Sequence, residues 1–347
     1  MITRIIKDVN TAVNEITAGN VISLPTETVY GLAADALNPD AVLKIYEAKN
    51  RPSFNPLIVH IDSIYDISVY GEEIPEELYK IAEKFSPGPI TYVVKKKRLI
   101  PDIVTAGLNS VALRIPAHPL FRAVIRKSGK PVAAPSANMF GRISPTNALD
   151  VLKELNGKIN FILDGGECNI GIESTVISFT DTIRSGVIYI LRPGLVTKEE
   201  IEDVSGLNIS IKYNIHPVAD ANMIKPAGDN NSHFLSPGML KNHYAPLTPL
   251  FTTDDIDYFL TNYKKVLPPD AGVINLGVFG SLHNIAVNLF RVLRVYDEKK
   301  YKYLVVSKVP NSGIGTAIND RLTKASTGCI RILNNELSFI RKDKDSG

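Results

Sequence analysis

The chain of 347 residues is poor in cysteine, with only Cys168 and Cys329, which are far apart and form no C-x-x-C pattern. This scarcity argues against a disulfide framework or a structural zinc site and favours a reducing cytoplasm. The N-terminus has no long apolar segment typical of a signal peptide, and no run of about 20 apolar residues follows it. We therefore predict a cytoplasmic protein without a membrane segment.

An excess of charge of either sign is also missing, because 39 basic residues face 36 acidic ones and the net charge is +3. The sequence has no polybasic tail of the kind that indicates nucleic-acid binding, although local basic patches can still bind phosphates. The run Lys95-Lys96-Lys97-Arg98 is the one dense basic cluster, and we expect it to be solvated at the end of a strand.

Alternating helix and strand signals occupy the first two hundred residues. Asn38 and Pro39 predict the capped start of a helix that runs to about Lys49, and Gly129 is expected to end another helix. Short β-branched segments bounded by Gly or Pro predict eight strands, at 21–25, 56–61, 90–96, 111–116, 131–137, 161–166, 174–179 and 187–194. Since the strands outnumber the helices available for βαβ winding, we expect an α/β domain with a twisted mixed sheet and flanking helices.

The amino-acid composition of the sequence changes at residues 214–249. This segment contains five prolines and three of the chain's six histidines and shows no periodicity. A functional loop is therefore favoured over an inert linker. A metal site is disfavoured, because the histidine spacings are irregular and no cysteine accompanies them.

After Pro249 a second α/β pattern begins, which predicts a smaller, Rossmann-like three-layer domain. Its strands are expected at 271–276, 303–309 and 329–333, and a helix at about 283–295. The Gly313-x-Gly315 turn opens a further helix, but the third glycine of a dinucleotide fingerprint is missing, so a tight turn is the better interpretation. The predicted organisation is a first domain at 1–210, an interdomain linker at 211–248 and a second domain at 249–347.

Polar and cationic residues follow several predicted strands of the first domain, at positions where ligands bind in α/β sheets. The stretch SLPTETVYGLAADA places Thr26 and Thr28 after a buried strand, and KNRPSFNP supplies Lys49, Arg51 and Asn55. The stretches APSANMFGRISPT, GIESTVI and ILRPG add Ser136, Asn138, Ser144, Ser174, Thr175 and Arg192. Each residue alone is explained by a cap, a turn or a solvated charge. Together they predict one pocket for a polyanion beside a small polar molecule.

Four positions of the first domain carry further expectations. Lys49 and Arg51 are expected to be exposed, with the neighbouring prolines fixing their approach to an anion. Ser144 precedes Pro145 and is expected to cap a helix whose first amides add anion donors. Arg114 lies within an apolar strand and needs a partner, for which a substrate carboxylate would serve.

Motifs for several other chemistries do not occur in the sequence, including G-x-S-x-G, GxxxxGK[ST] and HExxH. Ser136 as a nucleophile would need a base, and His60 lies far from it in the sequence. Catalysis by positioning and by stabilisation of charge is therefore the preferred hypothesis.

The quoted motifs SLPTETVYGLAADA, K-x-R, NPLIVH, S-x-N, GIESTVI and LRPG together resemble the YrdC family. The stretches SPGMLKNHYAP and GIGTAINDRL resemble its longer, two-domain form, the L-threonylcarbamoyl-AMP synthases. The resemblance implies a YrdC-like catalytic domain at 1–210, a linker at 211–248 that covers the active site, and a nucleotidyltransferase. The implied reaction makes threonylcarbamoyl-adenylate and pyrophosphate from L-threonine, bicarbonate and ATP, with Mg²⁺ held mainly by the ATP phosphates.

The resemblance also implies roles for individual residues, with Lys49 and Arg51 acting in catalysis. The implied ATP-binding residues are Lys49, Arg51, Asn55, Ser110, Ser136, Asn138, Ser144 and Arg192. The implied threonine-binding residues are Thr28, His60, Arg114, the backbone of Ala134, and Ser174. His243 and Tyr244 would form a lid over the site. Ser110 stands where the family more often has threonine, and it retains the hydroxyl group.

The implied product would be handed to a separate tRNA threonylcarbamoyltransferase, which modifies the adenosine beside the anticodon. An alternative function is an RNA-binding YrdC-type module, but a charge near neutrality argues against direct tRNA binding. A second alternative is a carbamoyltransferase of hydrogenase maturation, which shares a YrdC domain. That architecture requires zinc-finger cysteines, which two cysteines cannot supply.

Overall fold

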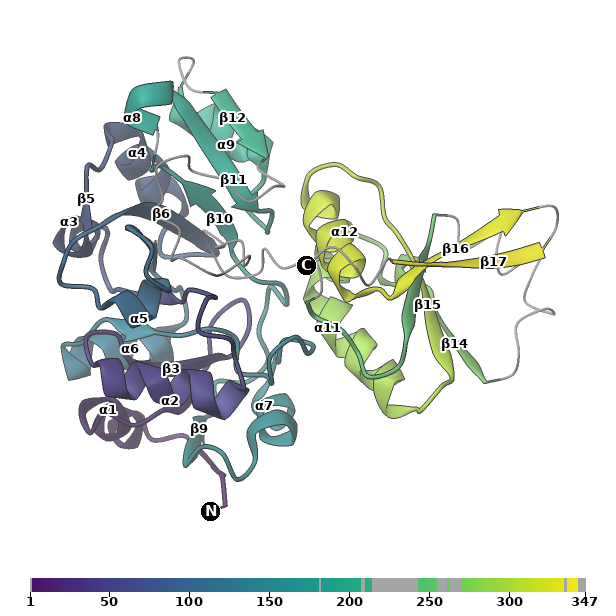
Figure 1. Cartoon of the computed structure of the whole chain (residues 1–347), viewed down its shortest axis with the longest axis horizontal. Coiled ribbons are helices and arrows are strands. Elements are labelled where there is room, and N and C mark those ends of the chain that lie inside the picture. The colour runs from purple at the N-terminus through teal and green to yellow at the C-terminus, as the bar shows by residue number, and fades with distance from the viewer. Residues whose placement is uncertain are drawn as a thin grey trace, which may run out of the picture.

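The computed structural model of the chain describes residues 2–180, 182–206, 210–213, 243–254, 261, 270–333 and 336–342. Most of the predicted interdomain linker, from 214 to 242, lies outside the described residues. The described residues build one large and one small β-sheet, with the helices α11 (Leu282–Glu298) and α12 (Ile314–Ala325) of the second sheet turned toward the first (Figure 1). Across the described residues, no helix combines the length and apolar character that crossing a membrane requires.

The large sheet is mixed, as predicted, and its main path runs β1-β9-β2-β3-β8-β4-β7-β6-β10-β11-β12, with β5 beside β6. Its strands are β1 Arg4–Ile6, β2 Ile22–Leu24, β3 Gly31–Asp35, β4 Ile58–His60, β5 Gly71–Glu72, β6 Ile90–Lys96, β7 Ser110–Arg114, β8 Val132–Ala133, β9 Phe161–Leu163, β10 Thr175–Ser178, β11 Val187–Arg192 and β12 Ser210–Tyr213. All eight predicted strands occur, and β1, β3, β5 and β12 join them.

Strand β8 is much shorter than the predicted strand at 131–137. Pro135 has no backbone N–H to donate, so the regular ladder is interrupted there. Backbone contacts nevertheless continue past it: the Leu32 N–H donates to the Pro135 carbonyl oxygen at 2.8 Å, and Ser136 forms an isolated bridge with Gly31. Ser136 and Asn138 therefore follow the end of β8 and remain held beside β3.

The helices of the first domain are α1 Val9–Thr17, α2 Pro39–Lys49, α3 Ile67–Tyr70, α4 Glu76–Phe85, α5 Asp102–Thr105, α6 Pro119–Ser128, α7 Ala148–Leu155, α8 Thr182–Ser185 and α9 Lys198–Ser205, with the 3-10 helix η1 at Ile64–Asp66. The predicted caps of α2 and α6 are confirmed, because the Asn38 side chain accepts from the first amides of α2 and Gly129 ends α6 in a left-handed conformation.

The expectation that Ser144 caps a helix is wrong. The cap of α7 is Asn147, whose side chain accepts from the Asp150 N–H at 2.9 Å. The Pro145 carbonyl oxygen is engaged instead by the Tyr30 N–H at 2.9 Å, which holds this segment beside the end of β2 and β3. The helix therefore starts later, and the Ser144 hydroxyl donates to the Glu173 carboxylate.

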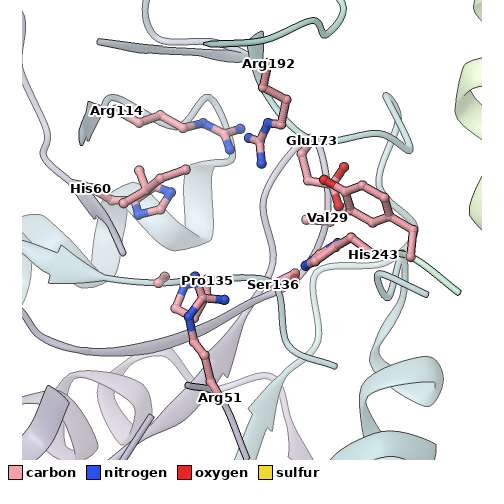
Figure 2. Close-up of a pocket in the computed structure, with 12 residues that line it drawn as sticks. Val29, Arg51, His60, Arg114, Pro135, Ser136, Glu173, Arg192 and His243 are labelled. Atoms are coloured by element: carbon pink, nitrogen blue, oxygen red, sulfur yellow. The ribbon is translucent and has the colours of Figure 1, made fainter. Parts of the chain in front are cut away.

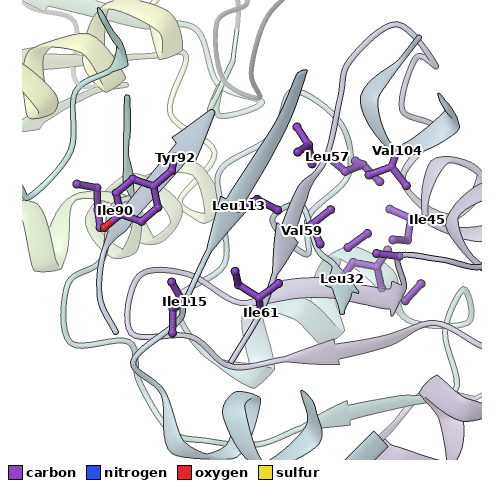
Figure 3. Packing of buried hydrophobic residues seen from close by; sticks show 14 of the residues in the cluster. Leu32, Ile45, Leu57, Val59, Ile61, Ile90, Tyr92, Val104, Leu113 and Ile115 are labelled. Carbon is purple, nitrogen blue, oxygen red and sulfur yellow. The ribbon is translucent and has the colours of Figure 1, made fainter. Parts of the chain in front are cut away.

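Alternation along the central strands separates a core face of the sheet from a second face. Val59 of β4 and Leu113 of β7 point into the main hydrophobic core together with Tyr92 of β6 (Figure 3). Their neighbours on the other face form a separate small apolar cluster, which consists of Ile58, Val93, Ala112, Val176 and Leu191. This second cluster, which we call the apolar floor, supports the polar residues described below.

The small sheet has the order β14-β15-β13-β16-β17. Its strands are β13 Leu250–Thr253, β14 Ala271–Ile274, β15 Tyr303–Ser307, β16 Gly328–Leu333 and β17 Glu336–Arg341, with the 3-10 helix η2 at Leu276–Phe279. The first four strands in this order are parallel, which confirms the Rossmann-like expectation, and β17 pairs antiparallel with β16. Strands β13 and β17 were not predicted.

Candidate active site

A cavity lies over the apolar floor of the large sheet. It is lined by Val29, Arg51, Ile58, His60, Arg114, Ala134, Pro135, Ser136, Glu173, Arg192, His243 and Tyr244. Figure 2 shows the guanidinium groups of Arg114 and Arg192 pointing toward one another, with Arg51 entering from the opposite side. The cavity volume is about 40 Å³, which admits a few water molecules but no nucleotide.

Lys49 and Arg51 are buried, so the expectation that they are exposed is wrong: their relative exposures are 1% and 7%. Asn50 ends α2 in a left-handed conformation (φ 49°) and turns both side chains inward. The Lys49 ammonium donates to the carbonyl oxygens of Ser136 and Asn138. Arg51 donates through Nε and Nη2 to the carbonyl oxygens of Asn55, at 3.1 Å, and Pro56, at 2.8 Å. Main-chain carbonyls thus compensate both charges and leave them available to an anion.

Arg114 already has a carboxylate partner within the chain. Its Nη2 lies 2.7 Å from Glu27 Oε1 and also donates to Thr28 Oγ1 at 3.0 Å. The other oxygen of Glu27 accepts from the Ala117 N–H at 3.0 Å. The sequence signalled that Arg114 needs a partner but not that Glu27, in the turn between β2 and β3, would supply it. Nε of Arg114 donates to the Gly88 carbonyl oxygen at 3.4 Å, so these contacts fix the guanidinium at the cavity wall.

Arg192 is fixed in a similar way by Ser174. Its Nε donates to the Ser174 carbonyl oxygen and its Nη2 to Ser174 Oγ, both at 3.0 Å. The Ser174 hydroxyl also shares a hydrogen bond of 2.8 Å with Thr91 Oγ1. Glu173, the preceding residue, lines the cavity and is buried. Burial raises the pKa of Glu173, but Arg321, Arg192 and a hydrogen bond from Ser144 outweigh it and the pKa is lowered.

Several polar atoms at or near the cavity are buried without a hydrogen-bond partner among the described residues. They are both side-chain amide atoms of Asn55, Nδ1 of His60, Oδ1 of Asn138, Nδ1 of His243 and Oη of Tyr244, and Oγ of Ser110 is a further one at the far end of β7. Buried polar groups are normally satisfied, because an unmet donor or acceptor costs free energy. Apart from the Ser110 hydroxyl, these unpaired polar groups lie close together, which indicates a binding site for a ligand with many polar atoms.

His243 and Tyr244 form one wall of the cavity, and both are buried. Their rings meet edge to face at 4.1 Å between centroids, and the Tyr244 ring stacks on Phe290 of α11 at 5.5 Å. These contacts place the two rings between the cavity and the C-terminal domain.

Most of the residues singled out in the sequence lie at or next to this cavity. Those that line it are Arg51, His60, Arg114, Ala134, Ser136, Arg192, His243 and Tyr244. Thr28, Ser144 and Ser174 each hydrogen-bond a lining residue, and Lys49 binds the Ser136 carbonyl oxygen. Asn138 offers its own carbonyl oxygen to the same ammonium, and Asn55 offers its carbonyl oxygen to Arg51.

Ser110 is set apart from these residues, because it lies at the opposite end of β7 from Arg114, although strand alternation puts both on the same face. Glu27, Glu173 and Arg321 were not predicted. All three stand inside motifs quoted above, Glu27 in PTETVYG, Glu173 in GIESTVI and Arg321 in GIGTAINDRL, and that placement was the available signal.

Burial shifts the pKa values of the titratable groups in the cavity. Burial and the nearby Arg114 lower the pKa of His60 to about 3, and burial with Arg51 and Lys49 lowers the pKa of His243 well below its usual value. Burial also raises the pKa of Tyr244 to about 12. Both histidines are therefore neutral at pH 7. Burial and the nearby Arg51 also lower the pKa of Lys49 well below its usual value, so the positive charge of the site resides mainly in the arginines.

The fold and the cavity together define an α/β protein with a pocket lined by three buried arginines. A family model named Sua5_yciO_yrdC, with the description "Telomere recombination", matches residues 14–194. A second model, described as "Threonylcarbamoyl-AMP synthase, C-terminal domain", matches residues 196–327. The chain belongs to the Sua5/YrdC family, in its two-domain form.

Proteins of this family are similar to the chain over most of its length. A threonylcarbamoyl-AMP synthase of Bacillus subtilis is 42% identical over 89% of this chain and 90% of its own, and one of Pyrococcus abyssi is 39% identical over 90% and 92%. A crystal structure of P. abyssi Sua5 complexed with L-threonine covers 94% of this chain and 98% of its own, with a TM-score of 0.81 and 37% identity.

The shifted pKa of His60 predicts a pH dependence of stability. In the unfolded chain His60 is protonated below about pH 6.5, whereas in the folded chain it is protonated only below about pH 3. The free energy of unfolding therefore falls as the pH falls between these two values. Between pH 7 and pH 5 the wild-type protein should lose about 2 kcal/mol more unfolding free energy than His60→Gln. Urea denaturation at both pH values measures the difference. Equal losses in the two proteins would show that His60 titrates normally.

Proposed function

We propose that the chain is a threonylcarbamoyl-AMP synthase. It converts L-threonine, bicarbonate and ATP into L-threonylcarbamoyladenylate, pyrophosphate and water, and so acts as a nucleotidyltransferase. The observation that carries this proposal is the convergence of three buried guanidinium groups, those of Arg51, Arg114 and Arg192, on one cavity. The names of the similar proteins and the L-threonine complex of the P. abyssi protein support the same reaction.

We assign the ATP phosphates to Arg51 and Arg192, which line the cavity, and to Lys49, whose ammonium binds the carbonyl oxygen of the lining residue Ser136. Arginine forks and a lysine ammonium suit phosphate oxygens, and their burial keeps water from screening them. The amide atoms of Asn55 and Asn138 Oδ1, which have no partner among the described residues, would supply further polar contacts, and the Ser110 hydroxyl would do so for a nucleotide that extends along β7. Ser136 and Ser144 complete the set at the end of β8 and ahead of α7.

We assign threonine to the side of Arg114 and His60. Arg114 is aligned by Glu27, Thr28 and the Gly88 carbonyl oxygen, and its Nη1 would receive the amino-acid carboxylate without reorganisation. His60 is neutral and its Nδ1 has no partner, so it offers a hydrogen bond rather than a charge. The Ala134 backbone and Ser174 lie beside these groups.

The chemistry requires no protein nucleophile. The threonine amine is carboxylated to a carbamate, and a carbamate oxygen attacks the α-phosphorus as pyrophosphate leaves. Negative charge grows on the phosphate oxygens during this step, and fixed cations in a water-poor cavity stabilise it. Lys49 and Arg51 are the residues to which we assign this catalytic role.

Mg²⁺ would enter with the nucleotide, since this ion prefers phosphate oxygens and one or two carboxylates. Glu173 is a carboxylate of the cavity wall, but Arg321 and Ser144 already engage it, so the donor set suits an ion bound mainly through the triphosphate. Within the described residues, no group of three or more His, Cys, Asp or Glu side chains is arranged to hold a metal. Bound Mg²⁺ would neutralise phosphate charge and orient the leaving group.

The product belongs to tRNA processing, where a separate transferase would receive it and modify the adenosine beside the anticodon. Both cysteines are free thiols, in keeping with a reducing compartment such as the cytoplasm.

Pyrophosphate release tests the function directly. Purified protein should release pyrophosphate only when ATP, Mg²⁺, bicarbonate and L-threonine are all present, and the adenylate should appear by mass spectrometry. Arg51→Met should lower kcat/KM at least about 100-fold, because a buried donor to the phosphates is lost. The exposed Arg126, outside the cavity, provides the control Arg126→Met, which should keep full activity. Release that ignores threonine would exclude this function.

Because His243 and Tyr244 form one wall of the cavity, we expect them to protect the product from water. In the double variant His243→Ala/Tyr244→Ala, water should reach the mixed anhydride, so a larger share of the consumed ATP should end as free AMP. Chromatography of the nucleotides after a fixed time measures this share. Replacement of the exposed Tyr65 by alanine is the matched control. An unchanged yield of intact adenylate in the double variant would refute the role of a lid.

A further inference from the structure

Arg321 is a side chain of the C-terminal domain that reaches the active site of the other domain. It lies on α12 and has 0% relative exposure. Its Nε donates to Glu173 Oε2 at 2.9 Å, and its Nη1 donates to the Pro193 carbonyl oxygen at 3.0 Å. Asp320, its neighbour on the helix, accepts a further bond from Nη1 at 2.6 Å. The guanidinium is therefore shared between its own domain and the wall of the cavity.

Glu173 connects Arg321 to the cavity. Its carboxylate lines the cavity, takes the Ser144 hydroxyl on Oε1 and the Arg321 guanidinium on Oε2. In Figure 2 it lies on the cavity wall between Arg192 and His243. Ser144 and Arg192 are the groups assigned above to ATP, so the charge of Glu173 directly affects the anion-binding side.

The two domains meet closely around this contact. The Arg321 guanidinium lies over the Tyr244 ring, with 5.3 Å between its Cζ and the ring centroid. Gly171, two residues before Glu173, approaches α11 so closely that a Cβ atom would lie 2.3 Å from the Val287 carbonyl oxygen. Such packing leaves little freedom for Arg321 to take another position.

The ion pair has a consequence for substrate binding. Without Arg321, Glu173 would be a buried carboxylate with one fewer compensating charge, beside a pocket that must accept a triphosphate. Like charges at close range in a site of low dielectric repel strongly. With Arg321 present, the same carboxylate is neutralised and the anion-binding side stays cationic.

We propose that Arg321 is a positioning residue for the reaction: it holds and neutralises the Glu173 carboxylate, and so makes ATP binding depend on the C-terminal domain. The assignment of ATP to this side rests on the function proposed above. The C-terminal domain thereby contributes to the site as an electrostatic partner and not only as a neighbouring unit.

The experiment uses the full chain and four variants, Arg321→Met, Arg321→Lys, Glu173→Gln and the double variant Glu173→Gln/Arg321→Met. Calorimetric titration gives the Kd for ATP, and pyrophosphate release gives kcat and the KM for ATP. Arg321→Met should raise the Kd and KM for ATP about tenfold or more, because the freed carboxylate repels the triphosphate. The double variant should return both to within about threefold of wild type, because glutamine carries no charge.

Arg294→Met is the matched control, because Arg294 is also a buried arginine of the C-terminal domain that pairs with carboxylates of the first. It contacts Glu154 at 2.9 Å and Asp150 at 3.4 Å and does not line the cavity. Thermal unfolding should reveal a loss of stability in both methionine variants, whereas only Arg321→Met should change the affinity for ATP. Arg321→Lys keeps the charge but loses the fork, and it should fall between wild type and Arg321→Met.

Two results would overturn the proposal: a wild-type affinity for ATP in folded Arg321→Met, or no recovery in the double variant. If Arg321→Met does not fold, Arg321→Lys and Glu173→Gln decide, since the former must weaken ATP binding and the latter must not. Failure of the proposed function is a separate outcome. It would appear as wild-type protein that binds ATP but releases no threonine-dependent pyrophosphate, and the Kd values would still test Arg321.

Discussion

Burial of positive charge over one face of the large sheet is the constraint on which the rest of the structure depends. Lys49, Arg51, Arg114 and Arg192 are each less than a tenth exposed. Taking a cation out of water is costly unless hydrogen bonds and opposite charges compensate it. Carbonyl oxygens compensate Lys49 and Arg51, Glu27 compensates Arg114, and Ser174 holds Arg192. These partners fix the cations before a substrate arrives, which is the condition for electrostatic stabilisation of a reacting phosphate.

The sheet accommodates these buried charges because its two faces carry different sets of side chains. Alternation along β4 and β7 directs Val59 and Leu113 into the main core and leaves Ile58 and Ala112 as an apolar floor under the charged groups. Ile58 of this floor lines the cavity together with His243 and Tyr244, and all three are buried. The C-terminal domain packs against that wall through Phe290 and Arg321, so the two domains share one site.

Much of the fold was predictable from the sequence, because its signals are local. Alternating β-branched runs between Gly and Pro predicted the central strands, and Asn38, Pro39 and Gly129 predicted helix ends that the structure confirms. The residues of the site were also predictable as a set, since they follow strand ends within recognisable motifs. Ser144 shows the limit of local reasoning, because a tertiary bond to Pro145 displaces the start of the helix that its sequence favours.

What the sequence could not supply were partners distant along the chain. Nothing local indicates that Lys49 is buried, because its compensating carbonyl oxygens belong to residues almost ninety positions away. The same holds for Arg114 and Glu27, and most clearly for Arg321 and Glu173, which are separated by 148 positions and belong to different domains. Such pairs are set by the topology of the sheet and the packing of the domains.

The central claim is that the buried cations on this sheet face hold a nucleotide and an amino acid together. A crystal structure of the protein with L-threonine and a non-hydrolysable ATP analogue tests it most directly. The account predicts the triphosphate against Lys49, Arg51 and Arg192, with the threonine carboxylate on Nη1 of Arg114. A nucleotide bound elsewhere, for example at the Gly313 turn of the C-terminal domain, with the cavity above β4 and β7 filled only by water, would contradict it.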